Sequence, residues 1–167
     1  MKNIIFLCHG AGNGGAERVI TTLAGAFADK GYFVRLVTTN ESKNDYILNS
    51  KIHHTRILSK KRNAVERTID RILKLRKCIK KNNPDCIVSF SSIPNMQAII
   101  ASLGLKCRVV ISERTDPSRY PTSRIGRMLR LLLYPFADAI VFQTDEAKAF
   151  FPKTIQEISE VIPNPIR

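Results

Sequence analysis

Residues 2–20 read KNIIFLCHGAGNGGAERVI, and the order of residue types in this stretch decides the fold. An apolar run comes first, a glycine-rich loop follows, and apolar residues at helical spacing come next. The helical pattern continues over residues 16–30 until Gly31 ends it. A buried strand, a short loop and a helix in this order are typical of the first unit of an α/β domain with a parallel sheet.

The same alternation repeats along the rest of the 167 residues. Patterns of helical periodicity lie between most of the apolar runs, and the strongest covers residues 64–82 before Asn83-Pro84 ends it. Short apolar runs predict strands at 4–8, 33–39, 54–58, 86–90, 108–112, 137–144 and 158–163. Strands that are apolar throughout need cover on both faces. We therefore predict a doubly wound, mainly parallel Rossmann-like α/β sheet, with residues 1–167 forming one domain.

The composition is that of an ordinary water-soluble domain, with 44% apolar and 25% charged residues. No apolar run approaches the roughly 20 residues that cross a membrane, and the opening MKNIIFLCHG is not a secretory signal. The four scattered cysteines form no Cys-x-x-Cys pair, so we expect reduced thiols in a cytoplasmic protein.

The net charge of +13 is high and unevenly distributed. Residues 60–81 contain ten Lys and Arg against two acidic residues, which indicates an anionic partner or, alternatively, a solvated helix face. We expect a membrane surface, because no aromatic residues interleave with the basic ones and no nucleic-acid-binding signature appears. We expect the protein to bind at the inner face of the membrane, and the expected anion-binding residues are Arg67, Arg71, Lys74, Lys77 and Lys81.

A second basic segment, residues 124–133, interleaves arginines with methionine and leucine. On a helix this sequence gives a wide apolar face with arginines beside it. Such a helix either packs into a core or lies at a membrane surface, and the sequence leaves both interpretations open.

The glycine-rich loop has two interpretations on residue pattern alone. Gly10-x-Gly12-x-x-Gly15 between a strand and a helix is found in NAD(P)-binding oxidoreductases, where backbone N–H groups hold the pyrophosphate. That site also needs an acidic residue at the end of the second strand, whereas this strand ends in Thr38-Thr39-Asn40. The match is partial, so an oxidoreductase domain and a non-catalytic basic membrane-binding module remain alternatives.

Three stretches together carry a resemblance to a known family. They are GGAERVITTLAGAFADKGYFVRLVTT (14–39), ISERTDP (111–117) and FADAIVFQTDEAKAFF (136–151) followed by VIPNPI (161–166). In this order they resemble the amino-terminal domain of the retaining nucleotide-sugar glycosyltransferases with the GT-B fold, of the glycosyltransferase family 4 type. The resemblance spans nearly the whole chain.

This resemblance implies a two-domain enzyme whose halves face a cleft. The amino-terminal half holds a glycan or lipid-linked glycan acceptor, and a carboxyl-terminal half, expected beyond residue 167, binds the nucleotide sugar. We expect the 167-residue fragment to be inactive without it. The resemblance also implies that Gly14 and Gly15 lie beneath the donor's diphosphate and sugar, with Ala16 beside them. No Asp-x-Asp motif is present, which fits the metal-independent type, so neither a metal nor a cofactor is expected.

The remaining candidates follow from the rule that α/β sheets bind ligands at the carboxyl ends of their strands. We assign acceptor binding to His9, Ser91, Arg114 and Thr144, and a catalytic role to Glu113 as a carboxylate that faces the cleft. Many family members carry a histidine at the position of Arg114. An arginine cannot act as a general base, but it can bind a phosphate or carboxylate in bidentate fashion.

Overall fold

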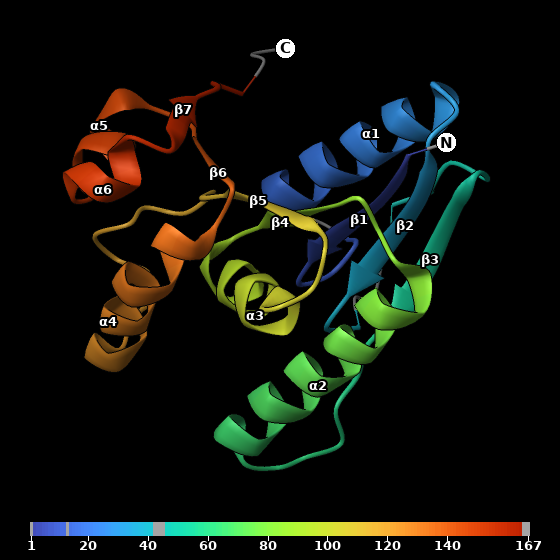
Figure 1. Cartoon of the computed structure of the whole chain (residues 1–167), viewed down its shortest axis with the longest axis horizontal. Helices are drawn as coiled ribbons and strands as arrows, with labels where there is room; N and C mark the ends of the chain where they lie inside the picture. Colours follow the sequence, from blue (N-terminus) through green and yellow to red (C-terminus); the bar gives the residue numbers. More distant parts are fainter. Residues whose placement is uncertain (1, 13, 42–45, 165–167) are drawn as a thin grey trace.

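The computed structural model describes residues 2–12, 14–41 and 46–164 (Figure 1). Seven strands form one sheet in the order β3-β2-β1-β4-β5-β6-β7, and every neighbouring pair is parallel. The strands are β1 (Asn3–Cys8), β2 (Phe33–Thr38), β3 (Ile52–Arg56), β4 (Cys86–Phe90), β5 (Arg108–Ser112), β6 (Ala139–Phe142) and β7 (Ser159–Val161). The predicted parallel α/β sheet is confirmed. The strand order changes direction between β1 and β4, where such sheets place their ligands.

Helices cover both faces of the sheet (Figure 1). They are α1 (Gly15–Asp29), α2 (Ala64–Asn82), α3 (Ser92–Ser102), α4 (Arg124–Leu133), the 3-10 helix η1 (Tyr134–Phe136), α5 (Asp145–Ala149) and α6 (Lys153–Gln156). On one face α1 packs Ile20 and Ala24 against Phe6 of β1. On the other face α2 and α3 cover β1, β4 and β5, and α4 lies beside α3. Two apolar cores thus hold the strand ends in fixed positions.

The long helix α2 begins and ends where its sequence predicts. The Asn63 side chain accepts a hydrogen bond from the Val65 N–H over 2.8 Å, which caps the first turn. At the other end Asn83 adopts the left-handed conformation with φ 42°, and Pro84 follows it. Local capping residues therefore mark both boundaries of the helix.

Strand β3 differs from its predicted position by two residues. It covers Ile52–Arg56 rather than 54–58, because Ile52 pairs with Val34 in the register of β2. Ile57 lies just beyond the strand and is buried in the core beneath α2. The short elements η1 and α6 have three and four residues, too few for a periodic pattern to predict.

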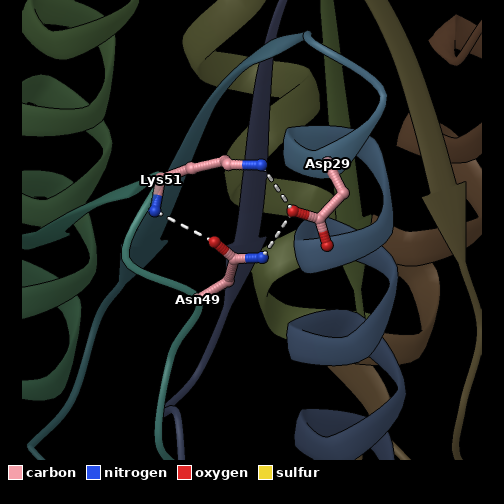
Figure 2. A network of polar contacts seen from close by, with 3 residues as sticks. All are labelled: Asp29, Asn49 and Lys51. Carbon is pink, nitrogen blue, oxygen red and sulfur yellow. Dashed lines mark hydrogen bonds and ion pairs between the residues drawn. The ribbon is translucent and has the colours of Figure 1, made fainter.

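A surface network ties the segment before β3 to the end of α1 (Figure 2). Asp29 Oδ1 accepts hydrogen bonds from Asn49 Nδ2 over 3.0 Å and from Lys51 Nζ over 2.9 Å. The Lys51 N–H in turn donates to Asn49 Oδ1 over 3.0 Å. Hydrogen bonding to Lys51, ahead of that to Asn49, lowers the pKa of Asp29. The network fixes how the chain returns to the sheet.

Candidate functional site

The start of α1 leaves an open space above Gly15, the second residue of the Gly14-Gly15 pair. Gly15 is exposed, and a Cβ atom built on it would meet no atom within 4 Å. Gly14 is extended, with φ −115° and ψ 152°, and the positive-φ glycines in the described ranges are Gly31 and Gly104. Neither crowding nor backbone conformation therefore requires glycine at position 15. The free space suits a ligand that approaches the helix start.

The Glu17 side chain covers Gly14, the residue that precedes α1. The Glu17 carboxylate lies so close to Gly14 that an added Cβ there would sit 1.9 Å from Oε2. Gly14 occupies the N-cap position of α1 and has no side chain to accept a hydrogen bond from the first N–H groups of the helix. Glu17 is not among the site residues predicted from the sequence, although an acidic residue three positions after Gly14 is a recognisable first-turn signal.

A pocket of about 240 Å³ opens at the carboxyl ends of β1 and β4. It is lined by His9, Glu17, Ser91, Ser92, Ile93, Pro94, Thr115, Tyr120 and Pro121. Two of the predicted acceptor residues, His9 and Ser91, thus share one cavity with Glu17. We call this cavity the His9 pocket.

The His9 ring is held in place, and its surroundings favour its neutral form. Its Nδ1 lies 3.1 Å from Thr39 Oγ1. Burial lowers the pKa of His9, the charge of Arg71 lowers it further, and Glu17 opposes both effects. A neutral ring can accept or donate a hydrogen bond to a hydroxyl in the pocket.

Ser91 has an unusual backbone conformation. Its φ is 77° and its ψ is 150°, a region used almost only by glycine, and its N–H donates to Ser112 O over 3.0 Å. Such a conformation costs of order 1–3 kcal/mol, and strain of this kind concentrates at ligand-binding sites. The strained residue opens α3 and lines the His9 pocket.

Glu113 is buried, and it also forms part of the wall of a pocket that it shares with Arg114. The residue is 2% exposed, and its carboxylate accepts hydrogen bonds from Ser92 Oγ over 2.9 Å, from Thr115 Oγ1 over 2.7 Å and from the Tyr134 hydroxyl over 2.6 Å. Burial, followed by the charge of Glu113, raises the pKa of Tyr134. The carboxylate thus joins β5 to α3, to the loop after β5 and to η1. The catalytic role of Glu113 stays a prediction, because three hydroxyl donors occupy the carboxylate while the residue still lines that pocket.

Arg114 and Thr144 line a second pocket of about 360 Å³, beside the first. The Arg114 guanidinium stacks 4.4 Å above the Phe90 ring and donates to Asn164 Oδ1. Burial lowers the pKa of Arg114. Thr144 Oγ1 accepts from the Ala147 N–H over 3.1 Å and so caps α5. Thr115 lines both pockets, so the predicted acceptor residues are divided between two neighbouring cavities.

The basic residues of α2 do not form one row in solvent. The Arg71 guanidinium turns to the sheet edge and donates to Asn40 Oδ1, and burial lowers its pKa. Lys74 donates to Leu58 O over 2.7 Å and to Asp70 Oδ2 over 2.8 Å. Arg67 is half-buried, whereas Lys77 and Lys81 are exposed. Arg71 therefore belongs with His9 and Asn40 rather than with the exposed lysines.

Helix α4 turns an arginine inward and its apolar residues outward. Arg130 is 1% exposed, donates to Tyr120 O and to Pro117 O, and lies 4.7 Å above the Phe151 ring. Its apolar residues Ile125, Met128, Leu129 and Leu132 are exposed. Periodicity predicts that this helix has an apolar stripe but not which way the stripe faces, and of the two open interpretations the exposed side chains do not support packing of the stripe into the core.

Other kinds of site are not found within the described residues. No three His, Cys, Asp or Glu side chains there lie together as a metal-binding group, and the four cysteines form no disulfide. None of the helices in that part of the chain is long and apolar enough to span a bilayer.

Comparison with curated proteins finds relatives that act on lipid-linked sugars. The chain is 28% identical over 162 residues to the Campylobacter jejuni α-1,4-N-acetyl-D-galactosaminyltransferase named for GalNAc-α-(1→4)-GalNAc-α-(1→3)-diNAcBac-PP-undecaprenol, and this match covers 95% of the chain and 45% of that protein. It is 30% identical over 150 residues to the N-acetylgalactosamine-N,N'-diacetylbacillosaminyl-diphospho-undecaprenol 4-α-N-acetylgalactosaminyltransferase of the same organism. That match covers 84% of the chain and 41% of the relative. The chain thus spans less than half the length of both.

Solved structures agree on the fold. The structure of Anabaena HepE in complex with UDP-glucose superposes with a TM-score of 0.72 at 16% identity, over 99% of this chain and 44% of HepE. The sequence profile of Glycosyltransferase Family 4 matches residues 13–167. The predicted resemblance is confirmed, and the chain belongs to Glycosyltransferase Family 4.

Proposed function

We propose that this chain is the acceptor-side half of a retaining glycosyltransferase that moves a sugar from a nucleotide sugar to a lipid-linked glycan. The observation that carries the proposal is the open space above Gly15, at the start of α1 and beside the His9 pocket. The two Campylobacter relatives, named for acceptors on diphospho-undecaprenol, support this substrate class.

In the proposed reaction the bond between the sugar and the donor's diphosphate breaks, and an acceptor hydroxyl oxygen forms the new bond while losing its proton. The N–H groups of Gly15 and Ala16, at the positive end of α1, stabilise the charge that develops on the leaving diphosphate. A second Rossmann-like domain beyond residue 167 supplies the other donor contacts. The amino-terminal domain, residues 1–167, contributes the positioning of the reactants and the electrostatic stabilisation.

The acceptor binds in the His9 pocket and extends towards Arg114 and Thr144. Neutral His9 and the Ser91 hydroxyl contact acceptor hydroxyls, and Arg114 binds an anionic group of the acceptor. Glu113 acts as a positioning residue, because its carboxylate holds Ser92 and Thr115, which line that pocket. We also propose that transfer needs no divalent metal, so activity should survive excess EDTA.

We further propose that the protein works at the cytoplasmic face of a membrane. Exposed Lys77 and Lys81, with the exposed residues Lys60, Lys61 and Arg62 before α2, attract anionic headgroups. Arg67, Arg71 and Lys74 add positive charge nearby, even though Arg71 and Lys74 have partners within the domain.

The test is an assay of the protein that joins this domain to its second half. UDP-N-acetylgalactosamine and other nucleotide sugars are offered with a polyprenyl-diphosphate glycan acceptor. We expect transfer by the longer protein and none by the 167-residue fragment. Turnover by the fragment alone would contradict the two-domain proposal. Tight binding of NAD(P) by the fragment would instead favour the oxidoreductase alternative, which family membership does not support.

A further inference from the structure

One carboxylate beside the His9 pocket has no hydrogen-bonding partner in the described part of the chain. Acidic residues elsewhere, such as Asp29 and Asp70, form ion pairs, and buried Glu113 accepts hydrogen bonds from three hydroxyls. The Glu17 carboxylate makes neither kind of contact with any described residue. Because the chain has 27 Lys and Arg against 14 Asp and Glu, a shortage of cations does not explain this.

Helix α1 determines where this carboxylate lies. Glu17 is the third residue of the helix, and its carboxylate reaches back over Gly14 at the N-cap position. The residue lines the His9 pocket and is close enough to the His9 ring to act on its charge. In a capping box a glutamate at this position binds the N-cap N–H, but the described residues Gly14 and Glu17 form no such hydrogen bond. Both carboxylate oxygens are therefore available to a ligand.

Two more polar groups of the His9 pocket are available in the same way. His9 uses Nδ1 for a neighbouring threonine, and its Nε2 has no hydrogen bond to another described residue. Ser91 Oγ also has no partner within the described ranges. The hydroxyls of Ser92 and Thr115, by contrast, donate to Glu113. Three separate elements thus each bring one free polar group to the pocket, from the end of β1, the start of α1 and the end of β4.

Apolar side chains complete the pocket. They are Ile93, Pro94, Tyr120 and Pro121. Ile93 is 45% exposed and Tyr120 is 51% exposed, so both offer apolar surface to a ligand. Apolar walls with a few placed polar groups are typical of pockets for small molecules. A sugar ring, with C–H groups on its faces and polar groups around its edge, matches both kinds of wall.

A carboxylate selects its ligands by the donors that they offer. It has two oxygens and no donor of its own when ionised, so it accepts from two neighbouring O–H or N–H groups at once. Such charge-assisted hydrogen bonds are stronger than those between neutral groups. The negative charge also disfavours a ligand that brings an anionic group to the same place. A neutral sugar with two adjacent donors therefore fits the surroundings of Glu17.

We propose that Glu17 selects the acceptor: its carboxylate accepts hydrogen bonds from two adjacent donors of a neutral sugar ring that lies against the apolar wall of the His9 pocket. The donors are two hydroxyls, or a hydroxyl and an acylamino N–H. His9 and Ser91 bind further polar groups of the same ring. Because Glu17 covers Gly14, the open space above Gly15 is left to the donor, and the two substrates meet at the start of α1. This inference rests on the proposed function, which places the acceptor in this pocket.

Acceptor kinetics of the full-length protein test the role of Glu17. The substrates are UDP-N-acetylgalactosamine, a short-chain polyprenyl-diphosphate N-acetylgalactosamine, and analogues of this acceptor that each lack one hydroxyl or the acetamido group. Glu17→Ala should lower kcat/KM for the complete acceptor by at least about tenfold, the value of a hydrogen bond to a charged group, and leave KM for the nucleotide sugar unchanged.

The analogues identify the hydrogen bond itself. At least one should be transferred less well by the parent, by about tenfold or more, but no less well than the complete acceptor by Glu17→Ala, because the partner is already absent. An analogue that loses the same factor with parent and variant does not contact Glu17. The same factor for every analogue, or parental kcat/KM in Glu17→Ala, would overturn the proposal.

Glu66 provides a matched control. It is the third residue of α2, as Glu17 is of α1, and it is exposed and does not line the His9 pocket. Glu66→Ala and Glu17→Ala remove the same group from the same turn of a helix, so they should change the free energy of unfolding by similar amounts. Glu66→Ala should transfer sugar like the parent. An equal loss of transfer in both variants would assign the effect to helix stability and overturn the proposal.

Gly14→Ala displaces the carboxylate without removing it. The backbone of Gly14, with φ −115° and ψ 152°, suits alanine, and the new Cβ meets only the end of the flexible Glu17 side chain. This variant should fold and should raise KM for the acceptor as Glu17→Ala does, and the double variant should be no worse than either. A raised KM for the nucleotide sugar alone would place the donor over Gly14 and contradict the proposal.

Binding of free sugars separates this inference from the proposed function, because it needs no transfer. Saturation-transfer NMR with methyl N-acetyl-α-D-galactosaminide should show binding to the full-length parent and to Glu66→Ala but not to Glu17→Ala. Methyl α-D-galacturonide, which is anionic, should bind more weakly to the parent than methyl α-D-galactoside, and Glu17→Gln should narrow that difference. Absence of transfer by the parent would refute the proposed function alone. Equal sugar binding by parent and Glu17→Ala, or none by the parent, would refute the role of Glu17.

Discussion

The Tyr134 hydroxyl donates a 2.6 Å hydrogen bond to Glu113 Oε2 in the interior of the domain. Glu113 follows β5 and Tyr134 follows α4, so this one contact joins the carboxyl end of an interior strand to the helix layer. Asn95 of α3 extends the network by donating to the same hydroxyl over 3.3 Å and to Ser112 O over 3.0 Å. The carboxylate thus links three elements of the domain beside the His9 pocket.

Replacing Glu113 should therefore destabilise the fold. Glu113→Gln leaves hydroxyl donors facing an amide that accepts through one oxygen only, and we expect a loss of about 2 kcal/mol in the free energy of unfolding. Tyr134→Phe should cost about 1 kcal/mol. Urea unfolding of both single variants and the double variant measures these losses. The loss in the double variant should differ from the sum of the two single losses, because the residues are in contact. Parental stability of Glu113→Gln combined with lost transfer would instead support the catalytic role predicted from the sequence.

Gly15 offers the opposite test, because the fold does not require it. Gly15→Ala should melt within a few degrees of the parent, since alanine is the better helix former and meets open space. Gly15→Val should also fold. Transfer by the full-length protein should fall by at least about tenfold with valine, equivalent to roughly 1.4 kcal/mol of barrier. Full activity of Gly15→Val would show that no ligand approaches this helix start.

Ser91 allows strain and chemistry to be separated with two substitutions. Ser91→Gly removes the hydroxyl and relieves the strained backbone, so the free energy of unfolding should rise by about 1 kcal/mol. Ser91→Ala removes the hydroxyl but keeps the strain, so it should not stabilise. If the hydroxyl contacts the acceptor, both variants should raise KM for the acceptor. Equal unfolding free energies for the glycine and alanine variants would show that the backbone at Ser91 is unstrained.

His9 should make stability depend on pH in a predictable direction. Its pKa is lowered in the folded state, so the unfolded chain binds the proton more readily. The free energy of unfolding should therefore be unaffected well above the unfolded pKa of about 6.5 and should decrease as pH falls below it. The decrease should stop below the folded pKa. Unfolding curves of the parent and His9→Gln across this range check the sign, and identical pH profiles would contradict it.

The sheet and most helices could be predicted because local patterns determine them. Apolar runs mark the strands, and α2 ends at Asn82, capped by Asn83, because the proline that follows disfavours a helical conformation. The direction in which a side chain faces was harder to predict from the sequence. Glu113 turns inward because Ser92, Thr115 and Tyr134, up to 21 residues away in the sequence, converge on it. Arg130 turns inward for a similar reason, since its carbonyl partners become available only when the loop after β5 folds back.

Thr115 stands in the wall of both pockets, with its hydroxyl fixed to Glu113. Two cavities with a common wall residue become thermodynamically linked when the occupant of one displaces that residue. A molecule in one cavity that displaces Thr115 changes the affinity of the other for its own occupant, and the coupling free energy is the same whichever site fills first. The order in which the two sites are filled therefore changes the path but not the total free energy of the doubly occupied state.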